Sequence, residues 1–126
     1  MSFPRTLAAA LATVALSTLS LTVAAQTVAV KCEVRSNRSK ASVDGNNLAS
    51  GQYSAVITSG ANTAQSPLDA TRGDEVEFDF DSNRRDIRQG ATAIAPNFIV
   101  NRSVTGQLLD AGGNVVATDT ATCRRK

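Results

Sequence analysis

The feature that most constrains this chain is an alternation of apolar and polar residues with a period of two. In residues 28–35 every second side chain is apolar or Cys, and charged residues such as Lys31 and Glu33 lie between them. The alternation is clearest in residues 76–80, which read VEFDF. Successive side chains of a strand point to opposite faces, so the pattern predicts antiparallel strands with one buried and one solvated face.

Turn residues divide the rest of the chain into short segments. Gly and Asn accept positive φ, and they mark turns at Asp44–Asn47 and Asp110–Asn114. Apolar alternation indicates further strands in residues 41–43, 53–57, 104–109 and 115–122. Residues 61–67 are either a weak strand or a loop, and Asn83 can cap a helical turn over residues 84–89. About seven short strands with frequent turns predict an all-β fold, a small antiparallel β-sandwich of immunoglobulin-like type.

The closing hairpin carries the one resemblance to known modules. Residues 104–117 read VTGQLLDAGGNVVA and contain the pattern Gly-x-x-x-Asp-x-x-Gly-Asn. This segment resembles the hairpin that is common in immunoglobulin-like and carboxypeptidase regulatory-like modules. The resemblance supports the predicted fold class and implies no functional residues.

The beginning of the chain predicts an export signal. Arg5 supplies a positive charge, residues 7–21 are an uncharged run of Ala, Leu, Val, Ser and Thr, and small residues precede Gln26. A membrane anchor is the alternative, but the apolar run is shorter than the roughly 20 residues that span a bilayer. We therefore predict a cleavable signal peptide in residues 1–25 and a single domain in residues 26–126. The mature chain is expected to be secreted or periplasmic, without membrane insertion.

The net charge of the chain limits the kind of partner that we expect it to bind. The sequence has 13 Lys and Arg against 11 Asp and Glu, a net charge of +2. Removal of Arg5 with the leader leaves +1. Nucleic acid binding calls for a marked basic excess, so nucleic acid is not an expected partner. We expect instead an unknown protein or glycan of the cell envelope.

Cys32 and Cys123 are the two cysteines of the chain. Two cysteines in an exported domain most simply pair with each other, whereas redox motifs place theirs two residues apart. A disulfide between Cys32 and Cys123 would close a loop of about 90 residues. Closing a loop of that length stabilises the fold by roughly 4–5 kcal/mol in the chain-entropy model.

The composition excludes several kinds of catalytic site. The chain has no His and no Trp, and its one Met is Met1. Zinc, copper and haem sites, and nucleophiles activated by His, are therefore not expected. Asp119 falls on the same face of its predicted strand as Cys123, so either the strand contains a bulge or Asp119 lies at a sheet margin.

Four carboxylates occupy alternate positions on the strand that also carries the clearest buried face. They are Glu75, Glu77, Asp79 and Asp81. One interpretation is a solvated face, partly neutralised by a neighbouring strand that contains either residues 31–35 or residues 38–40.

A calcium site is the alternative use of these carboxylates. Asp79, Asp81 and Asn83 have the spacing that begins an EF-hand loop, but the glycine and the final glutamate of that loop are missing. What remains is an irregular calcium site formed by these three side chains and Asp86. No other cofactor is predicted.

Three arginines, Arg84, Arg85 and Arg88, follow the acidic strand. They form either local ion pairs with Asp81 and Asp86 or an anion site. The anion would be a sulfated or phosphorylated glycan, a lipid head group or an acidic partner, because the planar guanidinium suits such groups.

The sequence thus favours a non-enzymatic binding or structural module of the periplasm or cell exterior. One alternative is a calcium-linked, adhesin-like module that uses the acidic strand. Another is a small carboxylate-dependent enzyme that acts on glycans, which requires two carboxylates close together in a cleft. Two close carboxylates in a pocket, one with a raised pKa, favour the enzyme, whereas acids spread along an exposed strand favour the binding module.

Overall fold

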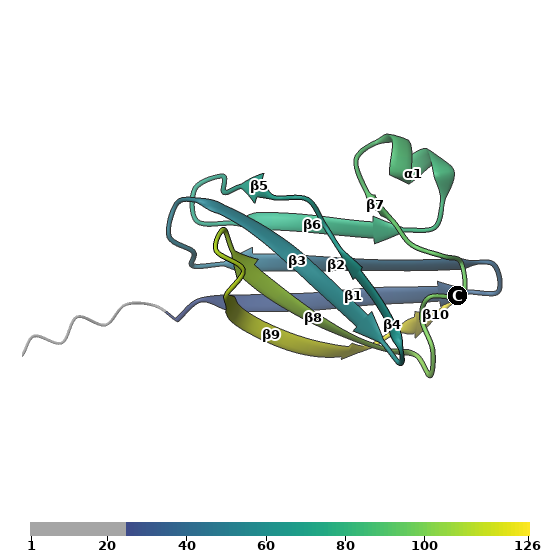
Figure 1. Ribbon diagram of the computed structural model, residues 1–126. Helices are drawn as coiled ribbons and strands as arrows, with labels where there is room; N and C mark the ends of the chain where they lie inside the picture. Colours follow the sequence, from purple (N-terminus) through teal and green to yellow (C-terminus); the bar gives the residue numbers. More distant parts are fainter. Residues whose placement is uncertain (1–24) are drawn as a thin grey trace, which may run out of the picture.

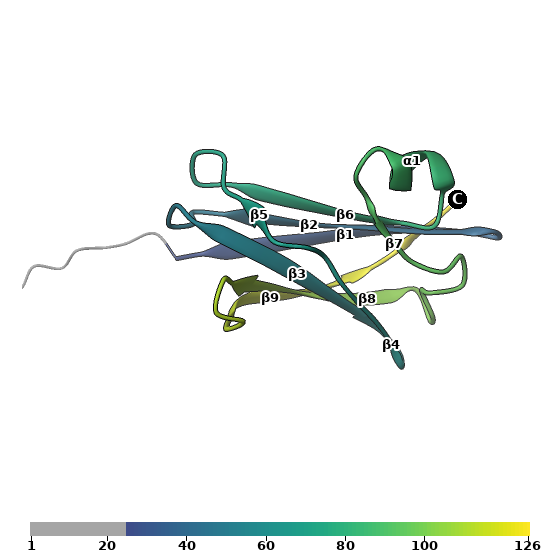
Figure 2. The same ribbon diagram turned by 45° about the horizontal axis from the view of Figure 1, so that its top comes forward.

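The computed structural model describes residues 25–126, which form two β-sheets packed face to face (Figure 1, Figure 2). The strands are β1 (Thr27–Arg35), β2 (Arg38–Asn46), β3 (Gln52–Ser59), β4 (Asn62–Gln65), β5 (Asp69–Ala70), β6 (Val76–Asp81), β7 (Thr92–Ala93), β8 (Ser103–Asp110), β9 (Val115–Thr122) and β10 (Arg124–Arg125). Sheet A has the order β10-β1-β2-β6-β7, and sheet B has the order β4-β3-β8-β9, with β5 also paired to β3. A short helix, α1 (Arg84–Arg88), lies on the face of sheet A that points away from sheet B (Figure 2). No helix in residues 25–126 has the length and apolar character needed to cross a bilayer.

The structure confirms a mostly β fold of two antiparallel-rich layers, but the predicted number of strands is wrong. The described residues contain ten strands instead of about seven. Three of them, β5, β7 and β10, have two residues each, which is too short for an alternating pattern to be visible in the sequence. The immunoglobulin-like type stays a prediction, and the predicted signal peptide falls outside the described residues except for Ala25.

The inner faces of the two sheets form one apolar core. Val43, Ile57 and Leu108 are completely buried, and the predicted apolar face of β6 is buried as well. Burial of each such side chain stabilises the fold by roughly 1.5–3 kcal/mol. The layers approach each other closely at Gly106, where an added Cβ would lie only 2.6 Å from Cγ2 of Val30.

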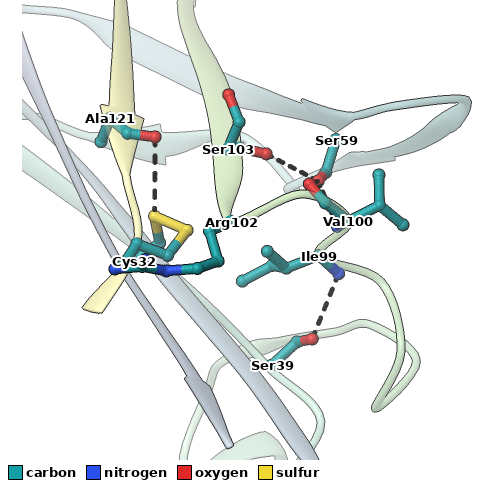
Figure 3. Close-up of a disulfide and its surroundings, with 9 residues drawn as sticks. Cys32, Ser39, Ser59, Ile99, Val100, Arg102, Ser103 and Ala121 are labelled. Atoms are coloured by element: carbon teal, nitrogen blue, oxygen red, sulfur yellow. Dashed lines mark hydrogen bonds between the residues drawn. A yellow bond between two sulfur atoms is a disulfide. The ribbon is translucent and has the colours of Figure 1, made fainter. Parts of the chain in front are cut away.

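Buried serines fasten the long loop that precedes β8 to the strands (Figure 3). The hydroxyl of Ser39 on β2 accepts a hydrogen bond from the backbone N–H of Ile99 at 3.2 Å. The hydroxyl of Ser59 on β3 accepts from the N–H of Val100 at 2.8 Å and donates to the carbonyl of Ser103 at 2.7 Å. These side chains replace backbone partners that the loop lacks, which allows its apolar residues to cover one end of the core.

The predicted disulfide between Cys32 and Cys123 is present and joins the two sheets (Figure 3). Cys32 lies on the inner face of β1 in sheet A, and Cys123 lies where the chain leaves β9 in sheet B to form β10 in sheet A. The bond therefore fixes the C-terminal residues beside β1.

Asp119 lies at a sheet margin, which is one of the two alternatives that its position left open. Its Oδ2 accepts a hydrogen bond at 2.9 Å from the backbone N–H of Val30, on the edge of β1. Strands β8 and β9 also contain a register shift, between Leu108 and Leu109, but it lies ahead of Asp119 and does not change its orientation relative to Cys123. The side chain thus closes the gap between the edges of the two sheets.

Candidate functional site

The outer faces of the two sheets differ in chemistry. On sheet A the outward positions of β1, β2 and β6 are mostly charged, whereas the outward positions of β3, β4, β8 and β9 on sheet B are uncharged. The polar outward residues of sheet B are Gln52, Ser54, Thr58, Thr63, Gln65, Ser103, Thr105, Gln107, Thr118, Thr120 and Thr122. The candidate site is therefore the outer face of sheet A.

Two neighbouring elements shape this face into shallow depressions. The segment of residues 66–72 borders β6, and the segment that follows α1 borders its far end (Figure 1, Figure 2). One depression, of about 600 Å³, lies between these borders, and another, of about 570 Å³, lies over the start of β6. Charged side chains line both, among them Asp79 and Arg72.

One half of the face is organised around Arg38. Its guanidinium donates to both carboxylate oxygens of Asp81, at 2.9 and 2.7 Å, and to Asp86 of α1 at 2.8 Å. Asp81 is 2% exposed. Burial alone would raise its pKa, but the hydrogen bonds from Arg38 and from the backbone N–H of Asn83 outweigh burial and hold the pKa below its usual value. The network thus fixes α1 against sheet A.

Two of the four residues of the predicted calcium site, Asp81 and Asp86, lie together in the structure, but they surround the Arg38 guanidinium. Asp81 and Asp86 bind Arg38, and the side chain of Asn83 caps α1 by accepting from the N–H groups of residues 85 and 86. Asp79 points outward without an ion pair among residues 25–126. Within the same residues no three Cys, Asp or Glu side chains are grouped so that they could hold a metal. The calcium site stays a prediction, and a cation there would have to displace Arg38.

The three arginines of the predicted anion site are exposed, and their expected local partners are engaged elsewhere. Asp81 and Asp86 both bind Arg38, and no carboxylate of residues 25–126 lies within 4.0 Å of the cationic groups of Arg84, Arg85 or Arg88. The alternative of local ion pairing therefore does not apply to these arginines. The anion site itself stays a prediction.

Two further cations, Arg124 and Lys126, were not predicted from the sequence and extend the basic surface that Arg84, Arg85 and Arg88 begin. Glu33 on β1 has Arg35 at 3.1 Å, Lys126 at 3.8 Å and Arg124 at 4.0 Å. Burial would raise the pKa of Glu33, but the hydrogen bond from Arg35 and the charges of Lys126, Arg35 and Lys40 lower it below its usual value. The available signal was the sequence Arg-Arg-Lys directly after Cys123, because the disulfide brings these residues beside β1.

We call the exposed cations of this half the basic rim. The basic rim consists of Arg35, Lys40, Arg84, Arg85, Arg88, Arg124 and Lys126. It follows the end of sheet A at which β1 turns into β2 and β6 runs into α1 (Figure 1).

The other half of the face carries carboxylates without ion pairs, which we call the acidic patch. The acidic patch consists of Asp44, Glu75, Glu77 and Asp79. Asp44 on β2 lies directly opposite Glu77 on β6. Burial raises the pKa of Asp44, and the charges of Asp79 and Asp44 raise the pKa of Glu77. Oδ1 of Asp44 is buried and has no hydrogen-bond partner.

No protein-family model, curated protein or solved structure matches this chain.

Proposed function

We propose that the protein is an exported, non-enzymatic binding module of the periplasm or cell exterior that contacts its partner through the outer face of sheet A. The observation that carries the proposal is the separation of positive and negative charge on this one face, between the basic rim and the acidic patch. The Cys32–Cys123 disulfide supports export, because such bonds persist in oxidising compartments.

The separated charges on the outer face of sheet A support a binding role because they do not stabilise the fold. Directly opposed like charges on neighbouring strands, such as Asp44 and Glu77, destabilise a sheet. Arg84, Arg85 and Arg88 make no ion pair in the described residues that would compensate. Separated charges of this kind orient a charged partner on the surface and make its binding specific.

Site-specific photocrosslinking in the producing cells tests the proposal. A photoreactive p-benzoylphenylalanine replaces Ser42, which lies at the centre of the outer face of sheet A, and in a matched variant it replaces Gln107 on the outer face of sheet B. We expect adducts, detected as a mass shift, from position 42 and none from position 107. Adducts from position 107 alone, or from neither position, contradict the proposal.

The carboxylate-dependent enzyme is a second candidate, and one observation favours it. Asp44 and Glu77 oppose each other across two strands, and both have a raised pKa. Directly opposed residues place their Cβ atoms about 4.5–5.5 Å apart, which is compatible with a pair of catalytic carboxyl groups. On this candidate the purified protein releases reducing ends from an envelope polysaccharide, and Asp44→Asn abolishes the release. No release from any such substrate eliminates it.

The calcium-linked module has no observation in its favour. Its test is the melting temperature of the protein with calcium and with EDTA, and equal values eliminate the site.

A further inference from the structure

We infer that the basic rim binds a linear polyanion bearing phosphate or sulfate groups, laid across the strands of sheet A. This inference rests on the proposed function, because it names the chemistry of the partner of the same face.

The cations of the basic rim lie on successive elements across the end of sheet A and form a track. Arg124 and Lys126 belong to the C-terminal residues at the β10 edge, Arg35 to β1 and Lys40 to β2, and the remaining three to α1, which follows β6. Adjacent strands lie about 4.8 Å apart, so the track runs over roughly 15 Å from β10 to β6 before it reaches α1. A track of this length faces several successive charges of a polymer.

The charge of this half of the face is strongly positive. The seven cations of the rim and Arg38 stand against three side-chain carboxylates, those of Glu33, Asp81 and Asp86, which leaves a net side-chain charge of +5. Five of the seven rim cations are arginines, whose planar forks donate two parallel hydrogen bonds to a phosphate or sulfate group.

The acidic patch decides the direction of the polymer. Asp79 lies only two residues before Asp81 on β6, about 6.5–7 Å along the strand. This is less than the Debye length of about 8–10 Å at moderate salt, so the patch repels a negative charge that strays from the rim along the strands. A polyanion therefore contacts the rim only when it runs across the strands.

The same repulsion separates a polymer from a membrane surface. A flat anionic bilayer large enough to cover the basic rim also covers the adjacent acidic patch, whereas a single chain can follow the rim alone. The juxtaposition of the two halves therefore favours a polymer over a lipid surface.

The backbone beneath the rim is fixed before any ligand arrives. The Arg38 network and the Asn83 cap hold α1, and the disulfide holds the C-terminal residues beside β1. Binding then orders side chains and not backbone segments, which lowers the entropic cost of association.

The test uses the purified mature protein with two polymer probes, a heparin oligosaccharide and inorganic polyphosphate, and with vesicles of phosphatidylglycerol. Binding is measured by titration calorimetry at salt concentrations between about 50 and 200 mM. We expect both polymers to bind with a salt-dependent affinity and the vesicles to bind weakly or not at all. Binding to vesicles without binding to either polymer overturns the inference.

Two rim variants and one control locate the contact. R84Q/R85Q/R88Q removes the arginines of α1, and R124Q/K126Q removes the C-terminal cations and leaves α1 intact. We expect at least about a tenfold loss of affinity for each, and a salt slope smaller by about 2 for the α1 variant, since each lost contact lowers it by about 0.7–0.9. Arg72→Gln, an exposed cation beside the acidic patch, leaves the affinity unchanged. Equal affinity of both rim variants and the wild type overturns the inference.

The double variant E77Q/D79N tests the direction of the polymer. Removal of the repulsion is expected to raise the affinity by about threefold or more, most clearly at low salt, where screening is weakest. An unchanged affinity contradicts the orientation across the strands. If the wild-type protein binds neither polymer but still gives crosslinks from position 42, this inference alone is overturned and the proposed function stands.

Discussion

The two halves of the outer face of sheet A use carboxylates in opposite ways. In the basic half every carboxylate contacts a cation, and Asp81 binds Arg38 through both of its oxygens. In the acidic patch, although Lys31 and Arg72 line the same depression, no carboxylate has a cation within 4.0 Å among residues 25–126. The comparison shows that ion pairs stabilise one half, whereas the other half carries a charge that opposes folding and is available to a partner.

The two halves also respond to pH in opposite directions. Asp81 and Glu33 have a lowered pKa, so their contribution to stability is present above the ordinary carboxyl value of about 4 and is lost as the pH falls through their lower folded values. Asp44 and Glu77 have a raised pKa, so they destabilise the fold at neutral pH. That destabilisation disappears as the pH falls through their folded values toward about 4.

Removal of the disulfide is the change in the basic half from which we expect the largest loss of stability. The double variant C32A/C123A is expected to lose about 4–5 kcal/mol of unfolding free energy, because the unfolded chain is no longer closed into a loop. It also frees the C-terminal cations from β1. Urea denaturation measures the loss, and a carboxyl NMR titration of Asp44 checks that the acidic patch keeps its raised pKa. A loss below about 1 kcal/mol contradicts the structural role of the bond.

Arg38→Met breaks the ion-pair network of the basic half. Asp81 is then a buried charge without a partner, and we expect a loss of about 3–5 kcal/mol at pH 7. The deficit shrinks when the pH is lowered to about 4, because Asp81 can become neutral. Arg72→Met, which removes an exposed cation with no ion pair in the described residues, serves as the control with little effect. A deficit that is the same at both pH values would show that lost packing and not the unpaired carboxylate is the cause.

Glu33→Gln tests the exposed ion pairs of the basic half. The substitution removes the carboxylate that faces Arg35, Arg124 and Lys126, and we expect a loss of about 1 kcal/mol or less, reduced further by salt. Thermal melting at low and high salt measures it. A gain in stability contradicts the assignment.

Glu77→Gln is the matched change in the acidic patch and has the opposite sign. Relief of the repulsion by Asp79 and Asp44 is expected to stabilise the fold by about 0.5 kcal/mol at pH 7, and the gain disappears near pH 4. Urea denaturation at the two pH values measures the difference. If Glu77→Gln and Glu33→Gln change the stability in the same direction, the contrast between the two halves is lost.

Local sequence patterns predicted much of the fold. The apolar alternation of residues 76–80, the hairpin over residues 104–122 and the turn capped by Asn83 each depend on neighbours in the chain, and all are present. Ser39 and Ser59 carry no such signal, because their partners in the loop before β8 are about 40 or more residues away.

The candidate site could be predicted only in part for the same reason. The sequence placed Arg84, Arg85 and Arg88 together on α1, and it placed the carboxylates on one face of β6. It left open which strand lies beside β6, and with it the partner of Asp81. The pairing of β2 with β6 selected Arg38, which is 43 residues away.

What the sequence determined by itself is therefore the set of strands with clear alternation, the pairing of its two cysteines and the separate clusters of charge. Only the tertiary structure decided that Arg38 neutralises Asp81 and Asp86, that the C-terminal cations join those of α1, and that Asp44 faces Glu77. The physical reason is that side-chain periodicity reports on residues close in the chain, whereas charge neutralisation depends on strand order and register, which only the packed sheets establish.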